Sequence, residues 1–328
     1  MKKIKTLTAL AMSLCLLAGT AAGCGTAAET AQGAEKRITV AIGSETGGMD
    51  PAGNIALTYL AYSVTALDEL LTFDENGEIE YRAAESYEVS EDAAEWTFHL
   101  RKDACWSDGT PVTSADFKNT MVRALDPKSA SGYANYLFPI ENAEEIYLGE
   151  TDAETLGVET PDEYTLIFHL ETPCVYFLEL LRLPVYTPSC SKYAAKTGSG
   201  WDKNPETSVA NGPFYLAEYV PEQYFVLRKN EKYWNAGAVH LDEITYRFFE
   251  DQQAMISAYE TGEADIAVSL PSVVMELYEG QEDLVVTDSI ATRYIYPNLN
   301  VKPLDDVRVR KAISLAIDRE ALCQMVGA

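Results

Sequence analysis

Few side chains in this sequence of 328 residues could carry catalysis. It contains three histidines, His99, His169 and His240, and the first two alternate with apolar residues as positions on a strand do. It has no nucleophile elbow, zinc-protease motif, P-loop or dinucleotide-binding loop, and Ser199 stands in a glycine loop with no evident histidine partner. We therefore predict a protein that is not an enzyme and that has no cofactor and no metal. Carboxylate pairs such as Glu144 and Glu145 leave a secreted acidic hydrolase as a remote alternative.

The N-terminus has the features of an export signal. Three lysines among the first five residues precede an apolar stretch at 7–18, which is shorter than the ~20 residues needed to span a bilayer. Small residues at 21–23 then lead into Cys24, an arrangement that resembles a lipoprotein box. We expect residues 1–23 to be a signal peptide, Cys24 to carry a lipid, and residues 24–36 to be a tether. Ordinary cleavage near Cys24 without lipidation is the alternative.

The charge of the chain limits its partners. Removing residues 1–23 takes away three lysines and no acid, which leaves 22 basic and 51 acidic residues and a net charge of −29. Such a surface repels nucleic acid and anionic lipid headgroups, so we expect no nucleic-acid partner.

The other cysteines of the exported part do not form a metal or redox motif. No two are spaced as C-x-x-C, which gives no support to a zinc ribbon or a thioredoxin-type site. We expect these thiols to be small buried apolar groups more readily than an essential disulfide; they are Cys105, Cys174, Cys190 and Cys323.

Residues 96–117 show how secondary structure must position any site. Trp96, Phe98 and Leu100 share one face of a predicted strand, and residues 106–111 form a Gly-Pro turn. Thr113 then caps a helix, with Asp116 as the acidic member of a capping box. We expect Trp96, Trp106, Asp108 and Asp116 to serve folding, because turn and cap chemistry already account for them.

Strands and helices alternate along the rest of the chain, which indicates α/β lobes. Two paired strands are predicted within 87–100, around a turn at 90–92. The other predicted strands are at 37–42, 165–170, 214–216, 225–227, 244–249, 264–268 and 294–299, and the helices at 56–71, 115–125, 252–261 and from Val307. In the last helix, Ala312, Ile313, Ala316 and Ile317 are predicted to form a buried face.

The segment at 96–117 resembles the signature of the bacterial extracellular solute-binding proteins of family 5, the dipeptide- and oligopeptide-binding proteins of ABC importers. Six further strings follow in family order: RALDP at 123–127, YANYL at 133–137, NGPF at 211–214, YWN at 233–235, GEAD at 262–265 and DVRVRKA at 306–312. The first two are similar to the oligopeptide-binding branch in particular.

This resemblance implies a two-lobe, class II periplasmic-binding-protein fold. The first lobe would combine a discontinuous domain at 37–66 and 190–288 with an inserted domain at 67–189. The second lobe would begin at 289–328, and most of it would be missing, so the sequence is expected to be truncated at its C-terminus. The residue that pairs with a peptide's α-amino group in relatives would lie in the missing part.

The resemblance also implies where a ligand would bind. A receptor for many peptides must recognise their backbone and charged ends, as an added strand does, inside a closed cleft. The implied ligand-binding residues follow strands or match family contact positions; they are Asn54, Ile55, Tyr133, Ser269, Arg293 and Tyr294. For Tyr133 the alternative is packing beneath the inserted domain, and for Arg293 it is a surface charge.

The expected function is that of a substrate-binding lipoprotein of an ABC importer. It would be exported and lipid-anchored on the extracytoplasmic face of the cell membrane, in the periplasm or at the cell surface. There it would capture oligopeptides and deliver them to permease subunits. Binding of another family ligand (a dipeptide, a nickel complex or an oligosaccharide) and sensing of signal peptides remain alternatives.

Overall fold

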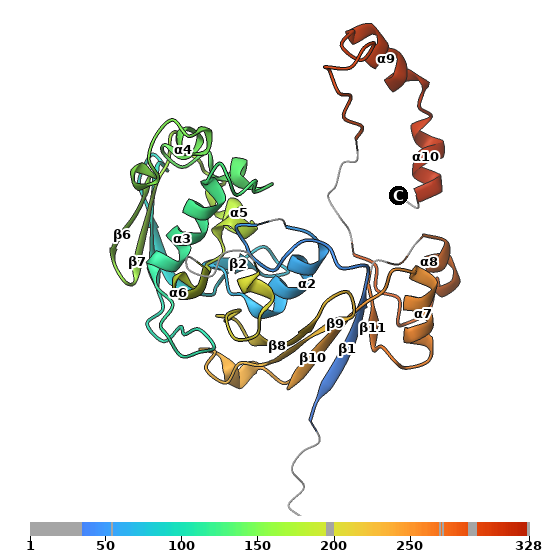
Figure 1. Cartoon of the computed structure of the whole chain (residues 1–328), viewed down its shortest axis with the longest axis horizontal. Coiled ribbons are helices and arrows are strands. Elements are labelled where there is room, and N and C mark those ends of the chain that lie inside the picture. The colour runs from blue at the N-terminus through green and yellow to red at the C-terminus, as the bar shows by residue number, and fades with distance from the viewer. Residues whose placement is uncertain are drawn as a thin grey trace, which may run out of the picture. The chain divides into compact units, whose positions relative to one another are not determined.

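The computed structural model describes residues 35–53, 55–194, 200–268, 270, 272–287 and 294–326. One five-stranded sheet has the order β11-β1-β10-β9-β8, and these strands cover Ile266–Ala267, Arg37–Ile42, Glu243–Phe248, Tyr224–Lys229 and Phe214–Val220. β1 runs parallel to β10 and β11, whereas β10, β9 and β8 pair antiparallel. Because residues 43–213 separate β1 from β8, this sheet is built from two distant parts of the chain (Figure 1).

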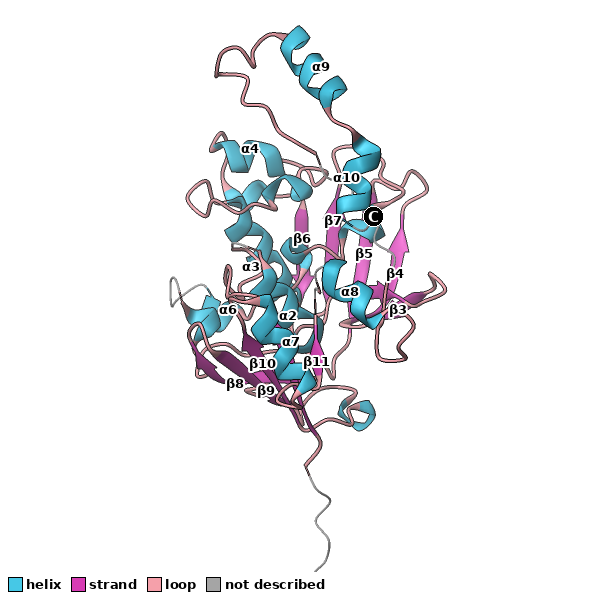
Figure 2. Ribbon diagram, turned by 90° about the vertical axis from the view of Figure 1, so that its right-hand side faces the viewer, coloured by secondary structure: helices cyan, strands magenta, loops and turns pink. Residues whose placement is uncertain are grey.

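Residues between these parts form a second, four-stranded antiparallel sheet with the order β4-β5-β7-β6. Its strands are Ala84–Val89, Glu95–Leu100, Thr165–His169 and Val158–Asp162, and a hairpin of β2 (Leu71–Phe73) and β3 (Ile79–Tyr81) precedes them (Figure 2). The side chains of Trp96, Phe98 and Leu100 are 4%, 0% and 2% exposed, which confirms the predicted inward face of β5.

Helix α3 (Ser114–Leu125) packs on this core through residues such as Phe117 and Met121. Its predicted capping box is confirmed: the Thr113 amide donates to Asp116 Oδ2 at 2.9 Å. The same carboxylate oxygen accepts from Trp106 Nε1 at 3.1 Å, so one buried aspartate joins the turn to the helix. This geometry accounts for both side chains as parts of the scaffold.

The five-stranded sheet is covered on both faces. Val40 and Ile42 pack with Tyr62 of helix α2 (Leu57–Ala66). Ala41, between them on β1, packs on the other side with Met255 of helix α7 (Gln252–Glu260). This alternation follows from the two-residue period of a strand.

The remaining helices are short. The α-helices are α4 (Ala143–Leu148), α5 (Phe177–Leu180), α6 (Ser191–Ala194), α8 (Ser272–Tyr278), α9 (Val307–Ala316) and α10 (Arg319–Val326). The 3-10 helices are η1 (Ala134–Leu137), η2 (Ala153–Thr155), η3 (Pro184–Tyr186), η4 (Trp201–Lys203) and η5 (Ala236–Ala238). Within the described part of the chain, none of the helices is both long and apolar enough to cross a bilayer.

The crossover between the two sheets explains one predicted landmark. The Gly212 amide donates to Ala66 O at 3.0 Å, and a Cβ on Gly212 would lie 2.7 Å from the Ala66 carbonyl carbon, so only glycine fits. Asn211 pairs with the backbone of Asp68, donating from Nδ2 at 2.8 Å and accepting at Oδ1 at 3.0 Å. The domain boundaries at 66/67 and 189/190 stay a prediction.

Three predictions about elements are wrong. Residues 294–299 form no strand, and Ala312, Ile313 and Ala316 of α9 are exposed rather than buried. Among the described residues no strand edge pairs with 294–299, and α9 buries none of its residues; a strand needs such an edge, and an apolar helix face needs a surface. The predicted helix at 56–71 ends at Ala66, because the chain turns there into the crossover.

Candidate functional site

The structure describes three of the six predicted ligand-binding residues, Ile55, Tyr133 and Tyr294. Asn54, Ser269 and Arg293 lie outside the described residues, and so does Cys24, the predicted lipidation site. Two segments position the described residues of the site: the loop that leads to Ile55 and the segment that leads to Tyr133.

Ile55 is half-buried and directly precedes the start of α2. The N-cap of this helix, Ala56, has no side chain that can cap it. Thr46 takes over this role: its Oγ1 accepts from the Leu57 amide at 3.2 Å and its carbonyl accepts from the Thr58 amide at 3.3 Å. The loop thus satisfies the first amides of the helix and fixes where Ile55 lies.

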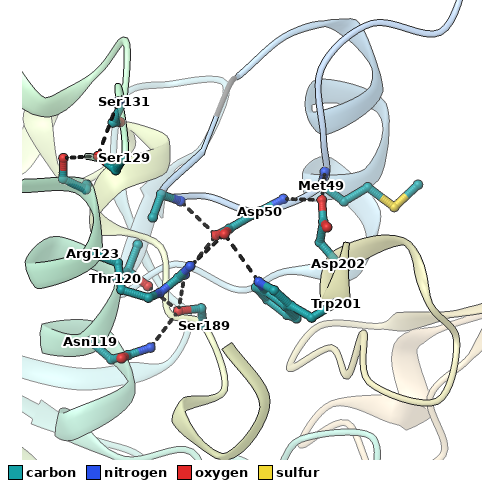
Figure 3. Close-up of polar contacts among 12 residues, drawn as sticks. Met49, Asp50, Asn119, Thr120, Arg123, Ser129, Ser131, Ser189, Trp201 and Asp202 are labelled. Carbon is teal, nitrogen blue, oxygen red and sulfur yellow. Dashed lines mark hydrogen bonds and ion pairs between the residues drawn. The ribbon is translucent and has the colours of Figure 1, made fainter. Parts of the chain in front are cut away.

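An ion pair holds the middle of the same loop. Arg123 donates from Nη1 to Asp50 Oδ2 at 2.6 Å and from Nη2 to Asp50 Oδ1 at 2.8 Å (Figure 3). The two side chains are only 21% and 19% exposed. Arg123 Nη2 also donates to Ser189 Oγ at 2.9 Å. A bidentate pair of this kind fixes orientation as well as distance.

Two further groups complete the environment of Asp50. Trp201 Nε1 donates to Asp50 Oδ2 at 3.3 Å, and the Arg123 guanidinium lies 5.6 Å from the Trp201 ring centroid. Asp202 Oδ2 accepts from the Met49 amide at 2.7 Å, and a Cβ on Gly48 would lie 2.7 Å from that oxygen. The conformation of the loop therefore depends on side chains from two other segments, as Figure 3 shows.

Glu45 anchors the beginning of the loop. Its carboxylate accepts hydrogen bonds from Lys203 and Tyr219 and, at 2.7 Å, from the Glu222 amide. Burial alone would raise the pKa of Glu45, but the hydrogen bonds from Lys203 and Tyr219 outweigh it, and the pKa lies below its usual value. The loop is thus fixed at Glu45 and at Asp50, a few residues before Ile55.

Tyr133 is half-buried at the N-cap of η1, where its ring centroid lies 5.5 Å from that of Tyr136 and it packs against the larger core. Contact with a ligand and packing beneath the inserted domain therefore both stay predictions. Ser131, two residues earlier, is 6% exposed, and within the described part of the chain its Oγ has no hydrogen-bond partner. Arg123 lies in the last turn of α3, from which the chain runs to this segment. The Asp50–Arg123 pair consequently joins the supports of Ile55 and Tyr133.

Tyr294 lies in the C-terminal part and is 64% exposed. Its hydroxyl is 2.6 Å from that of Tyr296, and their rings are 4.6 Å apart, edge to face. Among the described residues no contact brings Tyr294 to Ile55 or Tyr133.

The histidines of the four-stranded sheet lie on its outward face. His169 is 3.4 Å from Glu95 and 3.2 Å from Glu159, and His99 is 3.5 Å from Glu88. No group of three or more possible metal ligands gathers within the part of the chain that is described. The four thiols are free cysteines in the structure: Cys174 and Cys190 are buried as predicted, Cys105 is half-buried, and Cys323 is exposed, so the prediction is wrong for it.

Sequence reasoning missed the Asp50–Arg123 pair. Arg123 was singled out only as the first residue of the RALDP string, and its partner lies 73 positions upstream. The available signal was a charge in each of two otherwise apolar or turn-forming strings, Met-Asp-Pro at 49–51 and RALDP at 123–127. That signal marks candidates but does not pair them.

Known proteins share this architecture. The chain is 32% identical over 298 residues to the periplasmic oligopeptide-binding protein OppA of Haemophilus influenzae, covering 89% of this chain and 55% of that protein. It is 33% identical over 289 residues to the probable deoxycholate-binding periplasmic protein YgiS of Escherichia coli, covering 86% and 53%. The solved structure of the pheromone receptor PrgZ, which describes its mode of peptide binding, matches with a TM-score of 0.81 and 29% identity over 89% of this chain and 58% of that one.

The chain spans about half the length of the curated relatives it matches. The predicted α/β class is confirmed by the two sheets and by the match to solved binding proteins. The relatives named here are binding proteins, and the model of the bacterial extracellular solute-binding proteins, family 5 (middle), matches residues 78–327. The chain belongs to the bacterial extracellular solute-binding proteins of family 5.

Proposed function

We propose that this chain is the N-terminal part of a two-lobed substrate-binding protein that captures oligopeptides for an ABC importer. The first lobe would comprise 37–66, 190–288 and the inserted 67–189, and residues from 289 onward would begin the second lobe. The ligand would be enclosed between the lobes and handed to permease subunits. Closure is driven by ligand only insofar as the ligand binds the closed state more tightly than the open one.

The observation that carries this proposal is the half-buried Asp50–Arg123 pair (Figure 3). A receptor that reads peptide backbones must hold its own loops still, because each ordered hydrogen bond otherwise costs conformational entropy on binding. The pair joins the loop before Asn54 and Ile55 to the helix before Tyr133. The first of these segments would offer backbone groups, and the second an aromatic wall.

Two features support ligand contact near Tyr133. The exposed part of the Tyr133 ring can pack on an extended peptide. The buried Ser131 hydroxyl lacks a partner among the residues that the structure describes, and buried hydroxyls are normally hydrogen-bonded. A ligand group or an ordered water would satisfy it in the closed complex.

The proposed test is a thermal-shift screen of the complete gene product against di- to hexapeptides, with deoxycholate, oligosaccharides and nickel complexes alongside. Stabilisation by tri- to hexapeptides supports the proposal. Stabilisation by only one of the other compounds moves the protein to another ligand class of the same family. We expect the present 328-residue chain to bind peptides weakly or not at all, because half of the cleft would be missing.

Attachment to the outer face of the cell membrane through a lipid on Cys24 is part of the proposal. A single acyl chain binds membranes only marginally, so a diacylated N-terminal cysteine is the expected form. Mass spectrometry of the N-terminal peptide from the expressing cell checks this. A Cys24→Ser variant should be released into the soluble exported fraction, and its retention in the membrane would contradict the lipid anchor.

A peptide-signal sensor is the second candidate, favoured by the likeness to a pheromone receptor. Both functions use the same cleft, so peptide affinity does not separate them. Uptake of a labelled peptide that depends on the gene supports import, and a transcriptional response to the peptide without uptake supports sensing.

A further inference from the structure

A hollow of about 560 Å³ lies at the crossover between the two sheets. Its walls come from the last turn of α2, from the crossover itself and from the segment after α5. The lining is part apolar (Val64, Leu67, Leu183 and Pro213) and part charged (Asp68, Glu69, Arg82, Glu179 and Arg182). Val64 at the rim is 75% exposed, which is unusual for a valine on a packed helix.

Most charges in this hollow already have partners. Arg82 Nη2 lies 3.0 Å from Glu80 Oε2, and Arg182 Nη1 lies 3.6 Å from Glu179 Oε2. The Asp68 carboxylate is buried and accepts from Trp234 Nε1 at 2.9 Å. These contacts leave the two arginines and Asp68 engaged at the edges of the hollow.

Glu69 differs from these residues. It is half-buried, and within the described part of the chain no donor hydrogen-bonds to its carboxylate and no cation forms an ion pair with it. Burial raises the pKa of Glu69 to about 7; Arg182 and Arg82 act against this rise, and Asp68 adds to it. A cation that enters beside such a carboxylate stabilises its ionised form, because the low local dielectric strengthens the attraction between the two charges.

We propose that this hollow binds a small organic cation, with a primary ammonium group on the Glu69 carboxylate and an apolar body against Val64 and Leu183. The ammonium supplies the hydrogen bonds that Glu69 lacks, and the alkyl part covers the exposed apolar rim. Among the described residues, none of those proposed to contact peptide lines this hollow, and the inference does not depend on peptide transport.

Binding at this site is coupled to proton release from Glu69. The titratable groups that face Glu69 are Tyr59 of α2, Asp68 of the crossover, Arg82 of the β3–β4 segment, and Glu179 and Arg182 of the α5 segment. Below pH 7 the neutral carboxyl form dominates and attracts an ammonium only weakly. For a site that requires the carboxylate, affinity falls about thirty-fold between pH 8 and pH 5.5.

Isothermal titration calorimetry of the purified chain tests the proposal with three probes of one shape: 3-methylbutylammonium, 3-methylbutanol and 4-methylpentanoate. We expect the ammonium to bind at pH 8 with a dissociation constant on the order of 1 mM, as suits so small a ligand. The alcohol should bind at least tenfold more weakly, and the carboxylate should not bind. Equal binding of the alcohol, or absence of ammonium binding at pH 8, overturns the proposal.

Variants separate the site from general charge effects. Glu69→Gln should weaken ammonium binding at least tenfold, whereas Glu75→Gln, an exposed carboxylate in the β2–β3 turn, should leave it unchanged. Val64→Ala changes only an exposed side chain, so folding is preserved; it should weaken 3-methylbutylammonium but not methylammonium. Unchanged affinity in both the Glu69 and the Val64 variants would refute the assignment.

Discussion

Helices α3 and α9 both begin with a capping residue, but α3 lies in the core and α9 is exposed. α3 starts behind Thr113 with Asp116 as its box residue, and α9 starts behind Asp306, whose Oδ1 accepts from the Arg308 amide at 2.8 Å. α3 buries seven of its residues, whereas α9 buries none. The contrast shows that caps and amphipathic spacing decide where a helix begins, while a packing partner decides whether it stabilises the fold.

The largest expected difference between the two helices comes from core truncation. Phe117→Ala in α3 removes a side chain that is 0% exposed and should lower the free energy of unfolding by about 3–5 kcal/mol. Ile313→Ala in α9, whose side chain is 43% exposed, should change it by less than about 0.5 kcal/mol. Urea unfolding followed by tryptophan fluorescence measures both. Similar losses in the two variants would mean that α9 is packed in solution.

Ion pairs sharpen the same contrast. Arg123→Ala leaves the mostly buried Asp50 carboxylate without its cation and should cost about 3 kcal/mol, because an uncompensated buried charge is expensive. Hydrogen exchange at residues 49–53 should accelerate in this variant. Arg308→Ala removes an equally short pair with Asp306, but Arg308 is 87% exposed, so no measurable loss of stability is expected. Unchanged stability and unchanged exchange in the Arg123→Ala variant would show that the pair does not position the loop.

Cap residues should show a smaller difference. Asp116→Ala removes the acceptor for the Trp106 indole and for the Thr113 and Ser191 amides, and we expect a loss of about 2 kcal/mol in global stability. Asp306→Ala should reduce helicity only at 307–316 and leave global stability unchanged. Circular dichroism with urea titration distinguishes a global loss from a local one.

The smallest effect expected is one of pH. The pKa of Asp108 lies below its usual 3.8: burial acts to raise it, but hydrogen bonds from Lys192 and Thr110 outweigh burial. A depressed carboxyl pKa gives stability that is present above pH 4 and is lost as pH falls through the lowered value. Asp108→Asn should therefore flatten the fall in melting temperature between pH 4 and pH 2. Identical melting curves for the wild type and the Asp108 variant would contradict the role of Asp108.

The sequence predicted well what neighbouring residues decide. Three predictions depend on residues within 22 positions of one another, and the structure confirms them: the inward face of β5, the turn after it and the capping box of α3. The Asp50–Arg123 pair could not be predicted from the sequence, because its two residues meet only after both sheets have formed. The strand expected at 294–299 failed for the converse reason: pairing depends on an edge that the described residues do not supply.

Hydrogen-exchange mass spectrometry of the complete gene product, with and without a tetrapeptide that stabilises it, tests the central claim most directly. If peptide is held between two lobes, exchange should slow at residues 53–57, at 131–137 and at 294–300 together, while the outward face of the four-stranded sheet is unaffected. Slowing confined to one of these segments, or absent from all three, would contradict the proposed capture of peptide between lobes.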